Sequence, residues 1–281
     1  MSVLSAPSKG APSQAPMLGL LTLGAALAAS WVGINLVFPG LAPTGVPSAV
    51  TRVAIHTAIL AGLWLGLLRT DFSASKRAAI WLAVAVPFTL WLALVWNLAI
   101  NGFFQPDGAV RLPKLPIAIF APVAIGLFAL LRSKSIAAIL DATPASWLVA
   151  LQVYRILGGI FLVNWANGTV AGPFAWPAGI GDMLTGIMAL PVAFLLVSGA
   201  ANARRAAISW NIFGLVDFAV AITMGVLSNP GPLQIFGLDI PASLAGTYPI
   251  VMIPAFAVPS SILLHALSIW QLRRIGRGLH R

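Results

Sequence analysis

Eight apolar stretches, separated by short breaks rich in glycine, proline or charge, constrain this chain more than any other feature. Each stretch approaches or exceeds the ~20 residues that a helix needs to cross ~30 Å of hydrocarbon. The stretches are continuously apolar rather than alternating, which favours helices over the strands of a membrane barrel. Their limits are 17–38, 50–69, 78–104, 115–132, 146–166, 178–198, 207–228 and 248–271.

Composition places the chain in a membrane rather than in water. Of its 281 residues, 59% are hydrophobic and only 8% are charged, whereas a soluble domain carries about 25% charged residues. The net charge of +10 does not indicate nucleic-acid binding, because the basic residues are scattered at the ends of apolar stretches. We therefore expect an all-α, polytopic integral membrane protein in contact with the lipid bilayer, and no nucleic-acid partner.

The distribution of basic residues predicts the orientation. If the N-terminus is cytoplasmic, twelve basic residues fall on the cytoplasmic side, and three, Arg52, Arg111 and Lys114, fall on the opposite side. This bias follows the positive-inside rule, so both termini are predicted to be cytoplasmic, and we expect the plasma (inner) membrane of a bacterium. The twelve are Lys9, Arg69, Lys76, Arg77, Arg132, Lys134, Arg204, Arg205, Arg273, Arg274, Arg277 and Arg281.

The remaining segments complete the predicted organisation. Residues 1–16 are rich in Ala, Ser and Pro and are expected to form a disordered cytoplasmic tail. Transmembrane helices one to four occupy 17–132, and a cytoplasmic connection follows at 133–145. Helices five to eight, which contain the polar site, occupy 146–272, and 273–281 form a basic cytoplasmic tail.

The first apolar stretch has a second interpretation. Residues 17–30 (MLGLLTLGAALAAS) resemble a signal peptide, with an apolar core followed by small residues. The apolar run continues through Trp31, Ile34 and Phe38, so we favour a retained first helix. Cleavage would leave seven spans and the same orientation for the rest.

Three charged residues lie inside the second group of apolar stretches: Arg155, Asp182 and Asp217. The bilayer core offers no water to solvate a charge, so such residues usually face a partner or a wet cavity. Arg155 lies nine residues and Asp217 ten residues into stretches that both enter from the cytoplasmic side. Because their depths match, we predict an Arg155–Asp217 contact between helices five and seven, which lowers the cost of burying both charges.

Asp182 is predicted to lie nearer the membrane surface. It is only four residues into its stretch from the outer side, roughly 6 Å deep. Because it ends the segment 176–182 (WPAGIGD), capping of the helix N-terminus is its favoured role. The alternative is an opening on the outer face, with Asn164, Asn167 and Trp176 on the adjoining loop.

The charge balance of this region suggests two roles. One arginine facing two aspartates leaves a surplus carboxylate, which tends to hold a proton in a low-dielectric site. A protonatable pair is what a proton-coupled transporter needs. The alternative is that Arg155 and Asp217 form only a structural clip between two helices. Gln152 and Gly159 are expected to share the helical face of Arg155, at i−3 and i+4.

His265 also lies within an apolar stretch. Ser261 and Ser268 are its neighbours one turn away on either side. The ring is either hydrogen-bonded within its own bundle or an inner step in a proton route. A haem shared with His56 is not expected, because the two histidines lie at different depths and axial ligands need a common height.

The sequence shows no pattern for metal or cofactor chemistry. It contains no cysteine and no glutamate, no HExxH motif and no lysine inside an apolar stretch. Thiolate sites, helical zinc sites and a retinal Schiff base therefore have no ligands here. We expect no metal and no cofactor.

The favoured function is that of a small-solute transporter or permease, coupled to protons through the buried Asp and Arg residues. Its ligand is an unidentified small molecule. Two alternatives stay open: a membrane-embedded enzyme acting on a lipid or quinone, and a structural or accessory membrane subunit. An enzyme is less favoured, because no accepted nucleophile is present. The candidate ligand or proton site comprises Arg155, Asp217, Asp182, His265, Gln152 and Asn164.

Overall fold

The computed structural model describes residues 14–105 and 114–278, and within them every regular element is helical. Among these described residues, eight helical segments are long and apolar enough to cross a membrane, which confirms the predicted fold class. Most of the predicted N-terminal tail and the end of the C-terminal tail lie outside the described residues. The elements are α1 (Gln14–Val37), η1 (Ala42–Thr44), α2 (Val46–Leu68), α3 (Ala74–Ile100), α4 (Lys114–Arg132), α5 (Lys134–Ala142), α6 (Ser146–Leu151), η2 (Gln152–Gly159), α7 (Ile160–Ala166), α8 (Gly172–Ser198), α9 (Ala203–Ser228), η3 (Ala242–Gly246), η4 (Ile253–Ala257) and α10 (Val258–Gly278).

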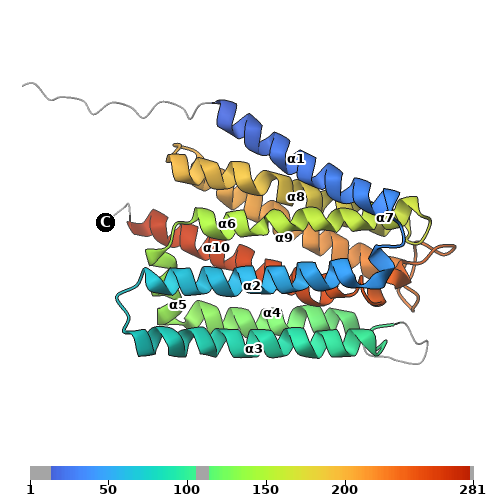
Figure 1. Ribbon diagram of the computed structural model, residues 1–281, viewed down its shortest axis with the longest axis horizontal. Coiled ribbons are helices and arrows are strands. Elements are labelled where there is room, and N and C mark those ends of the chain that lie inside the picture. The colour runs from blue at the N-terminus through green and yellow to red at the C-terminus, as the bar shows by residue number, and fades with distance from the viewer. Residues whose placement is uncertain (1–13, 106–113, 279–281) are drawn as a thin grey trace, which may run out of the picture.

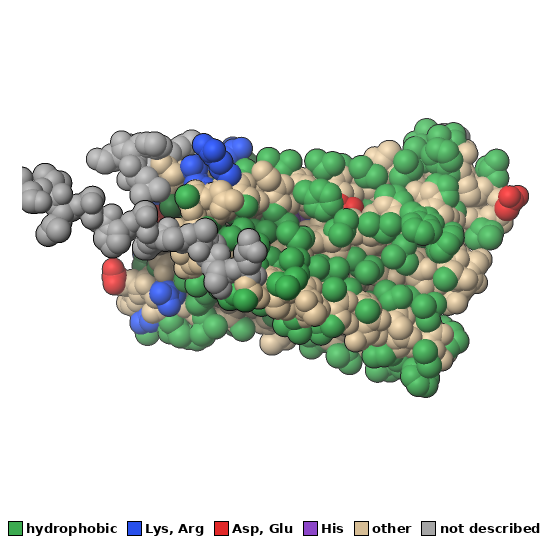
Figure 2. Space-filling model, turned by 90° about the horizontal axis from the view of Figure 1, so that it is seen from above, with side chains coloured by type: hydrophobic (Ala, Val, Ile, Leu, Met, Phe, Trp, Pro, Cys, Tyr) green, Lys and Arg blue, Asp and Glu red, His purple; other side chains and the backbone are tan. Residues whose placement is uncertain are grey.

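The long helices run side by side along the longest axis of the molecule (Figure 1). The start of α1 and the end of α10 lie at the same end of this bundle, which we call the terminal end; the opposite end is the distal end. Lys and Arg side chains gather near the terminal end, and hydrophobic side chains cover much of the rest of the face shown in Figure 2. This distribution suits a bundle whose flanks contact lipid tails and whose terminal end meets a polar surface.

The second half of the chain forms the packed centre of the bundle. Helix α8 packs against α9, η2, α6, α7 and α1, and α10 packs against α4 and α9. Phe256 and Met252, near the distal start of the last span, are fully buried. By contrast, α4 carries the large exposed side chains Ile125 and Phe128, which suit contact with lipid.

The fifth span is not one continuous α-helix. It consists of α6, an eight-residue 3-10 stretch (η2) and α7. A 3-10 stretch in the middle of a helix is uncommon and often marks a hinge. Two adjacent glycines, Gly158 and Gly159, end η2 and weaken the local preference for an α-helix. Such irregular backbone is tolerated at membrane depth only where protein buries it, and η2 is covered by α8 and α1.

The predicted cytoplasmic connection at 133–145 contains a short amphipathic helix, α5. The side chain of Ser133 caps it by accepting a hydrogen bond from the backbone N–H of Ile136. Its apolar face is buried, while Asp141 pairs with Arg274 near the end of α10. This helix therefore ties the connection to the terminal end of the last span.

Candidate functional site

Arg155 lies at the centre of a buried ion cluster that joins η2, α8 and α9. Its Nε donates to Oδ1 of Asp182 at 2.7 Å, and its Nη2 is also 2.7 Å from that oxygen. Nη2 also pairs with Oδ2 of Asp217. This confirms the predicted contact between the fifth and seventh membrane spans, which contain η2 and α9 respectively. The ring of Phe218 lies 3.8 Å from the guanidinium carbon, close enough for a cation–π contact. One cation is thus held by two carboxylates and an aromatic face.

The prediction that Asp182 sits at the membrane rim is wrong. Helix α8 begins at Gly172, so Asp182 follows the helix start by ten positions rather than four. At 1.5 Å per residue this places it about 15 Å inside the helix, near the depth of Arg155 and Asp217. Its carboxylate contacts the guanidinium of Arg155 instead of capping the first turn. The helix starts earlier than expected because Pro173 occupies its first turn, where a missing N–H costs no hydrogen bond.

The ring of His265 contacts Nη1, the other terminal nitrogen of the Arg155 guanidinium. Its Nε2 lies 3.1 Å from Nη1 of Arg155, and its Nδ1 lies 2.9 Å from Oδ1 of Asn211. An arginine can only donate, so Nε2 must accept, and Nδ1 must carry the proton that it gives to Asn211. The amide nitrogen of Asn211 donates in turn to Ser268 Oγ and to the carbonyl of Ala207. His265 therefore has both ring nitrogens occupied as a neutral ring, a geometry that favours hydrogen bonding within the bundle over a proton route.

The predicted neighbours of Arg155 change with the helix type. Side chains three positions apart eclipse in a 3-10 helix, so Gln152 and Gly158 align with Arg155, and Gly159 does not. Gln152 is fully buried and donates to the carbonyl of Ser261 at 3.1 Å. A Cβ on Gly158 would collide with Asp182, whereas one on Gly159 would meet the side chains of other neighbours. The α-helical spacing assumed from sequence therefore selected the wrong glycine.

A second close approach positions Asp217. A Cβ on Gly181 would overlap the carboxylate of Asp217. The absence of side chains at Gly158 and Gly181 lets η2, α8 and α9 approach closely enough for one guanidinium to reach both acids.

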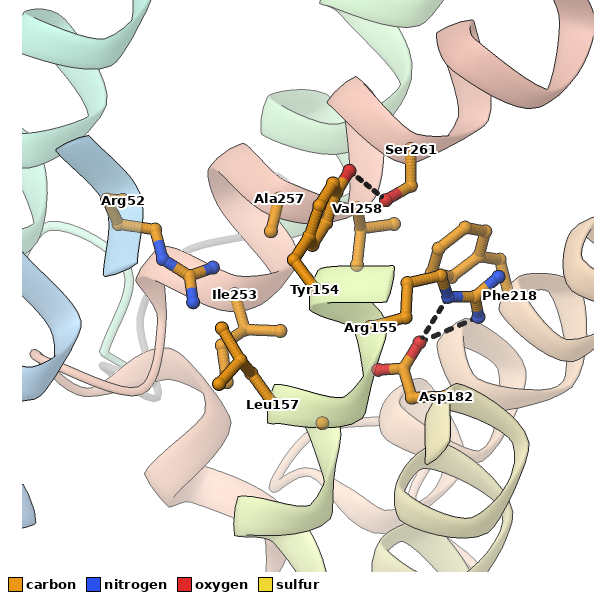
Figure 3. A pocket seen from close by; sticks show the side chains of 11 residues that line it. Arg52, Tyr154, Arg155, Leu157, Asp182, Phe218, Ile253, Ala257, Val258 and Ser261 are labelled. Carbon is orange, nitrogen blue, oxygen red and sulfur yellow. Dashed lines mark hydrogen bonds and ion pairs between the residues drawn. The ribbon is translucent and has the colours of Figure 1, made fainter. Parts of the chain in front are cut away.

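A narrow cavity extends from this cluster toward α2 (Figure 3). Its volume is about 20 Å³, which is room for about one water molecule. Arg155 and Asp182 lie on one side of it, and Arg52 reaches toward it from α2. The hydroxyl of Tyr154, 2.6 Å from Ser261 Oγ, forms part of the wall. The buried acid Asp182 therefore borders an internal space.

The structure does not bring Asn164 into the cluster. It lies in α7, where its backbone carbonyl accepts hydrogen bonds from the backbone and hydroxyl of Thr169. Its buried amide nitrogen has no partner among the described residues. Trp176, which was predicted to lie on the adjoining outer loop, lies in the first turns of α8 and packs edge to face against Trp165, with ring centroids 4.7 Å apart.

Sequence reasoning missed Arg52, which it counted as a residue of the outer side. Helix α2 begins at Val46, so Arg52 lies inside the span and is 4% exposed. The predicted start of this helix, residue 50, was again too late, because Pro47 lies in the first turn of α2 rather than in the preceding loop. The aromatic partner Phe218 carried no sequence signal beyond its position next to Asp217.

The fold and the ion cluster define a polytopic helical membrane protein with its charged site in the second half of the chain. The protein belongs to a family described as "Domain of unknown function (DUF8737)", which matches residues 112–273, more than half of the chain. The match includes Arg155, Asp182 and Asp217, whereas Arg52 precedes it. No curated protein and no solved structure matches the chain.

Proposed function

We propose that this protein is a proton-coupled carrier of a small solute in the bacterial inner membrane, with both termini in the cytoplasm. The observation that carries the proposal is one guanidinium held between two carboxylates, at membrane depth, beside a cavity. With both aspartates ionised the cluster of Arg155, Asp182 and Asp217 has a net charge of −1. With one bound proton it is neutral. Such a site has the two charge states that proton coupling requires.

The second carboxylate argues against a purely structural clip. A clip between two helices needs one acid for one guanidinium, and each further buried charge adds a desolvation cost. Ionisable residues inside membrane bundles commonly mark proton or substrate paths. Asp182 borders the cavity, so it is the acid better placed to exchange a proton with bound water or solute. Asp217, held on the far side of the guanidinium, is placed to bind Arg155 when Asp182 is protonated.

The broken fifth span supports a moving site. Carrier proteins often bind their substrates at discontinuous helices near the bilayer midplane. Here the discontinuity is η2 itself, and it carries Arg155. A change in η2 would therefore move the guanidinium relative to both acids and could widen the narrow cavity.

The test is solute-driven proton movement in proteoliposomes that contain the purified protein and an internal pH-sensitive dye. A panel of acetate, lactate, neutral amino acids and simple sugars is applied outside, with labelled solute followed in parallel. We expect at least one solute to enter together with protons. Asp217→Asn should abolish the proton movement, because Asp182 is then the one counterion left to Arg155 in the cluster and stays ionised. Exchange of labelled solute across the membrane should be retained, because exchange needs no net proton transfer.

Asp141→Asn is the matched control, because Asp141 also pairs with an arginine but lies at the terminal end, outside the cluster. It should transport solute and protons like the wild type. Two results would contradict the proposal: no solute of the panel crossing faster than in empty vesicles, or proton movement in Asp217→Asn equal to that of the wild type.

A further inference from the structure

Arg52 is a second buried arginine, and its surroundings are incomplete. It follows the start of α2 by six positions, about 9 Å from the distal end of that helix. Only 4% of the residue is exposed. Its side chain leaves α2 and points toward Leu157 and Ile253 in the interior (Figure 3). The charge is therefore inside the bundle rather than turned outward to the membrane surface.

The hydrogen-bond donors of Arg52 are poorly used. Nη1 is 3.5 Å from the carbonyl of Met252, at the limit of a hydrogen bond, and Nη2 is 3.3 Å from the hydroxyl of the adjacent Thr51. Nε has no partner, and no carboxylate of the described residues lies within ion-pair distance of the guanidinium. An uncompensated buried cation is costly, because burial removes the water that solvates it. Arg52 thus lacks an anionic partner among the described residues.

Two cavities meet at this side chain. Arg52, Leu157 and Ile253 line both the cavity beside the ion cluster and a second one between α1 and α2. The second has a volume of about 30 Å³, room for about two water molecules, and is also lined by Asn35, whose buried Oδ1 has no hydrogen-bond partner among the described residues. Arg52 can only donate, and this oxygen of Asn35 can only accept. The space around Arg52 therefore offers unused donors for an anion and one unused acceptor.

We propose that Arg52 anchors an anion-binding site in the distal half of the bundle, where it pairs with an oxyanion, that is, a carboxylate or phosphate group. The neighbouring Nε and Nη2 donors suit the two oxygens of such a group. The free oxygen of Asn35 suits a ligand hydroxyl or ammonium group beside the oxyanion. This inference goes beyond the carrier proposal, because anion binding at Arg52 requires no transport.

Two sources could supply the oxyanion. A free solute would reach Arg52 from the distal end, whereas a lipid head group would reach it from the adjacent membrane surface. The chemistry recognised is the same, so the experiment has one arm for each source.

The first arm measures the thermal unfolding of purified protein in neutral detergent. Sodium acetate, butyrate or phosphate is compared with sodium chloride at equal ionic strength. We expect the unfolding midpoint of the wild type to rise by several degrees with at least one oxyanion. The second arm compares nanodiscs of phosphatidylcholine with and without phosphatidylglycerol. A rise only in the second arm identifies a lipid phosphate as the ligand.

Arg52→Gln should remove the rise and weaken binding of the active probe, measured by calorimetry, by roughly 10- to 100-fold. Ile253→Phe retains the arginine but places a larger side chain in the wall that both cavities share. It should therefore reduce the space beside Arg52 and also weaken binding. Arg205→Gln, at an exposed position on α9, removes the same charge as a matched control and should bind like the wild type.

Equal responses of wild type and Arg52→Gln to every probe in both arms would overturn the anion site, as would the absence of any response in the wild type. Should Arg52→Gln not fold, Ile253→Phe and Arg52→Lys provide the same comparison, because lysine retains the charge without the bidentate fork. Asp217→Asn separates this inference from the carrier proposal. It should lose proton coupling and still bind the oxyanion, since Asp217 does not line either cavity.

Discussion

Arg155 and Arg52 are both buried arginines in membrane-spanning helices, yet the chain treats them in opposite ways. Arg155 has two carboxylates, a histidine nitrogen, a backbone carbonyl and an aromatic ring around its guanidinium. Arg52 has two long hydrogen bonds to neutral oxygens and one unused donor. The first site has its counterions within the chain, whereas the second has none among the described residues. Removal of the arginine should therefore lower the free energy of unfolding at Arg155 but not at Arg52.

The largest effect is expected at Arg155. Arg155→Ala leaves Asp182 and Asp217 buried without a counterion, so the free energy of unfolding should fall by about 3–5 kcal/mol. Detergent-induced unfolding followed by tryptophan fluorescence measures this loss. Adding Asp182→Asn and Asp217→Asn to the same variant should recover part of the stability, because the unpaired charges are then removed. Equal and negligible losses in Arg155→Ala and Asp217→Asn would show that these residues do not stabilise each other.

The packing beneath the complete site gives the second prediction. Gly181→Ala places a methyl group where the carboxylate of Asp217 lies. The side chain or α9 must shift, and the free energy of unfolding should fall by about 1–3 kcal/mol. Gly33→Ala in α1 is the matched control, because open space surrounds Gly33, and it should leave the stability unchanged or slightly higher. A similar response of both variants would mean that the close approach at Gly181 is not required.

A smaller difference in the free energy of unfolding is expected between substitutions of the two acids, Asp182 and Asp217. Asp182 contacts both Nε and Nη2 of Arg155, whereas Asp217 contacts only Nη2. Asp182→Asn should therefore lower the free energy of unfolding more than Asp217→Asn, with losses of about 1–3 kcal/mol for each. The same unfolding titration ranks them, and the reverse order would show that the contact between Arg155 and Asp217 is the stronger one.

The smallest effect, and the opposite sign, is expected at Arg52. Arg52→Leu removes a buried cation that has no counterion among the described residues, so in neutral detergent without added anions the free energy of unfolding should be unchanged or rise by up to about 1 kcal/mol. Thermal unfolding of the two proteins side by side provides the measurement. A loss as large as that of Arg155→Ala would show that Arg52 has a strong partner within the chain.

The sequence was sufficient for the spans and for one half of the site. Continuous apolar runs located the eight candidate membrane spans of the described residues, and matching depths correctly paired Arg155 with Asp217. The sequence placed Asp182 and Arg52 too close to the membrane surface, and for both residues the reason is the same. Both follow prolines, Pro173 and Pro47, that were taken as loop residues but lie in the first turns of α8 and α2. Each helix therefore begins four to six residues earlier than predicted, which moves its charged residue deeper into the bundle.

Other parts of the site could not be read from spacing alone. An α-helical repeat was assumed for the fifth span, so Gly159 was placed beside Arg155 instead of Gly158. The 3-10 stretch packs against α8 and α1, and a single sequence does not display these contacts. The chain of hydrogen bonds from His265 to Asn211 likewise depends on how α9 and α10 face each other.

The 3-10 stretch makes the fifth span longer than an α-helix with the same number of residues. Eight residues rise about 2.0 Å each in this form and 1.5 Å each in an α-helix, so conversion of η2 would shorten the span by about 4 Å. Each residue also turns through a smaller angle in the α form, so Arg155 would rotate about the helix axis as α7 is drawn inward. A conversion of η2 to α geometry would therefore couple a rotation of the Arg155 guanidinium to a shift of α7 along the axis of the span.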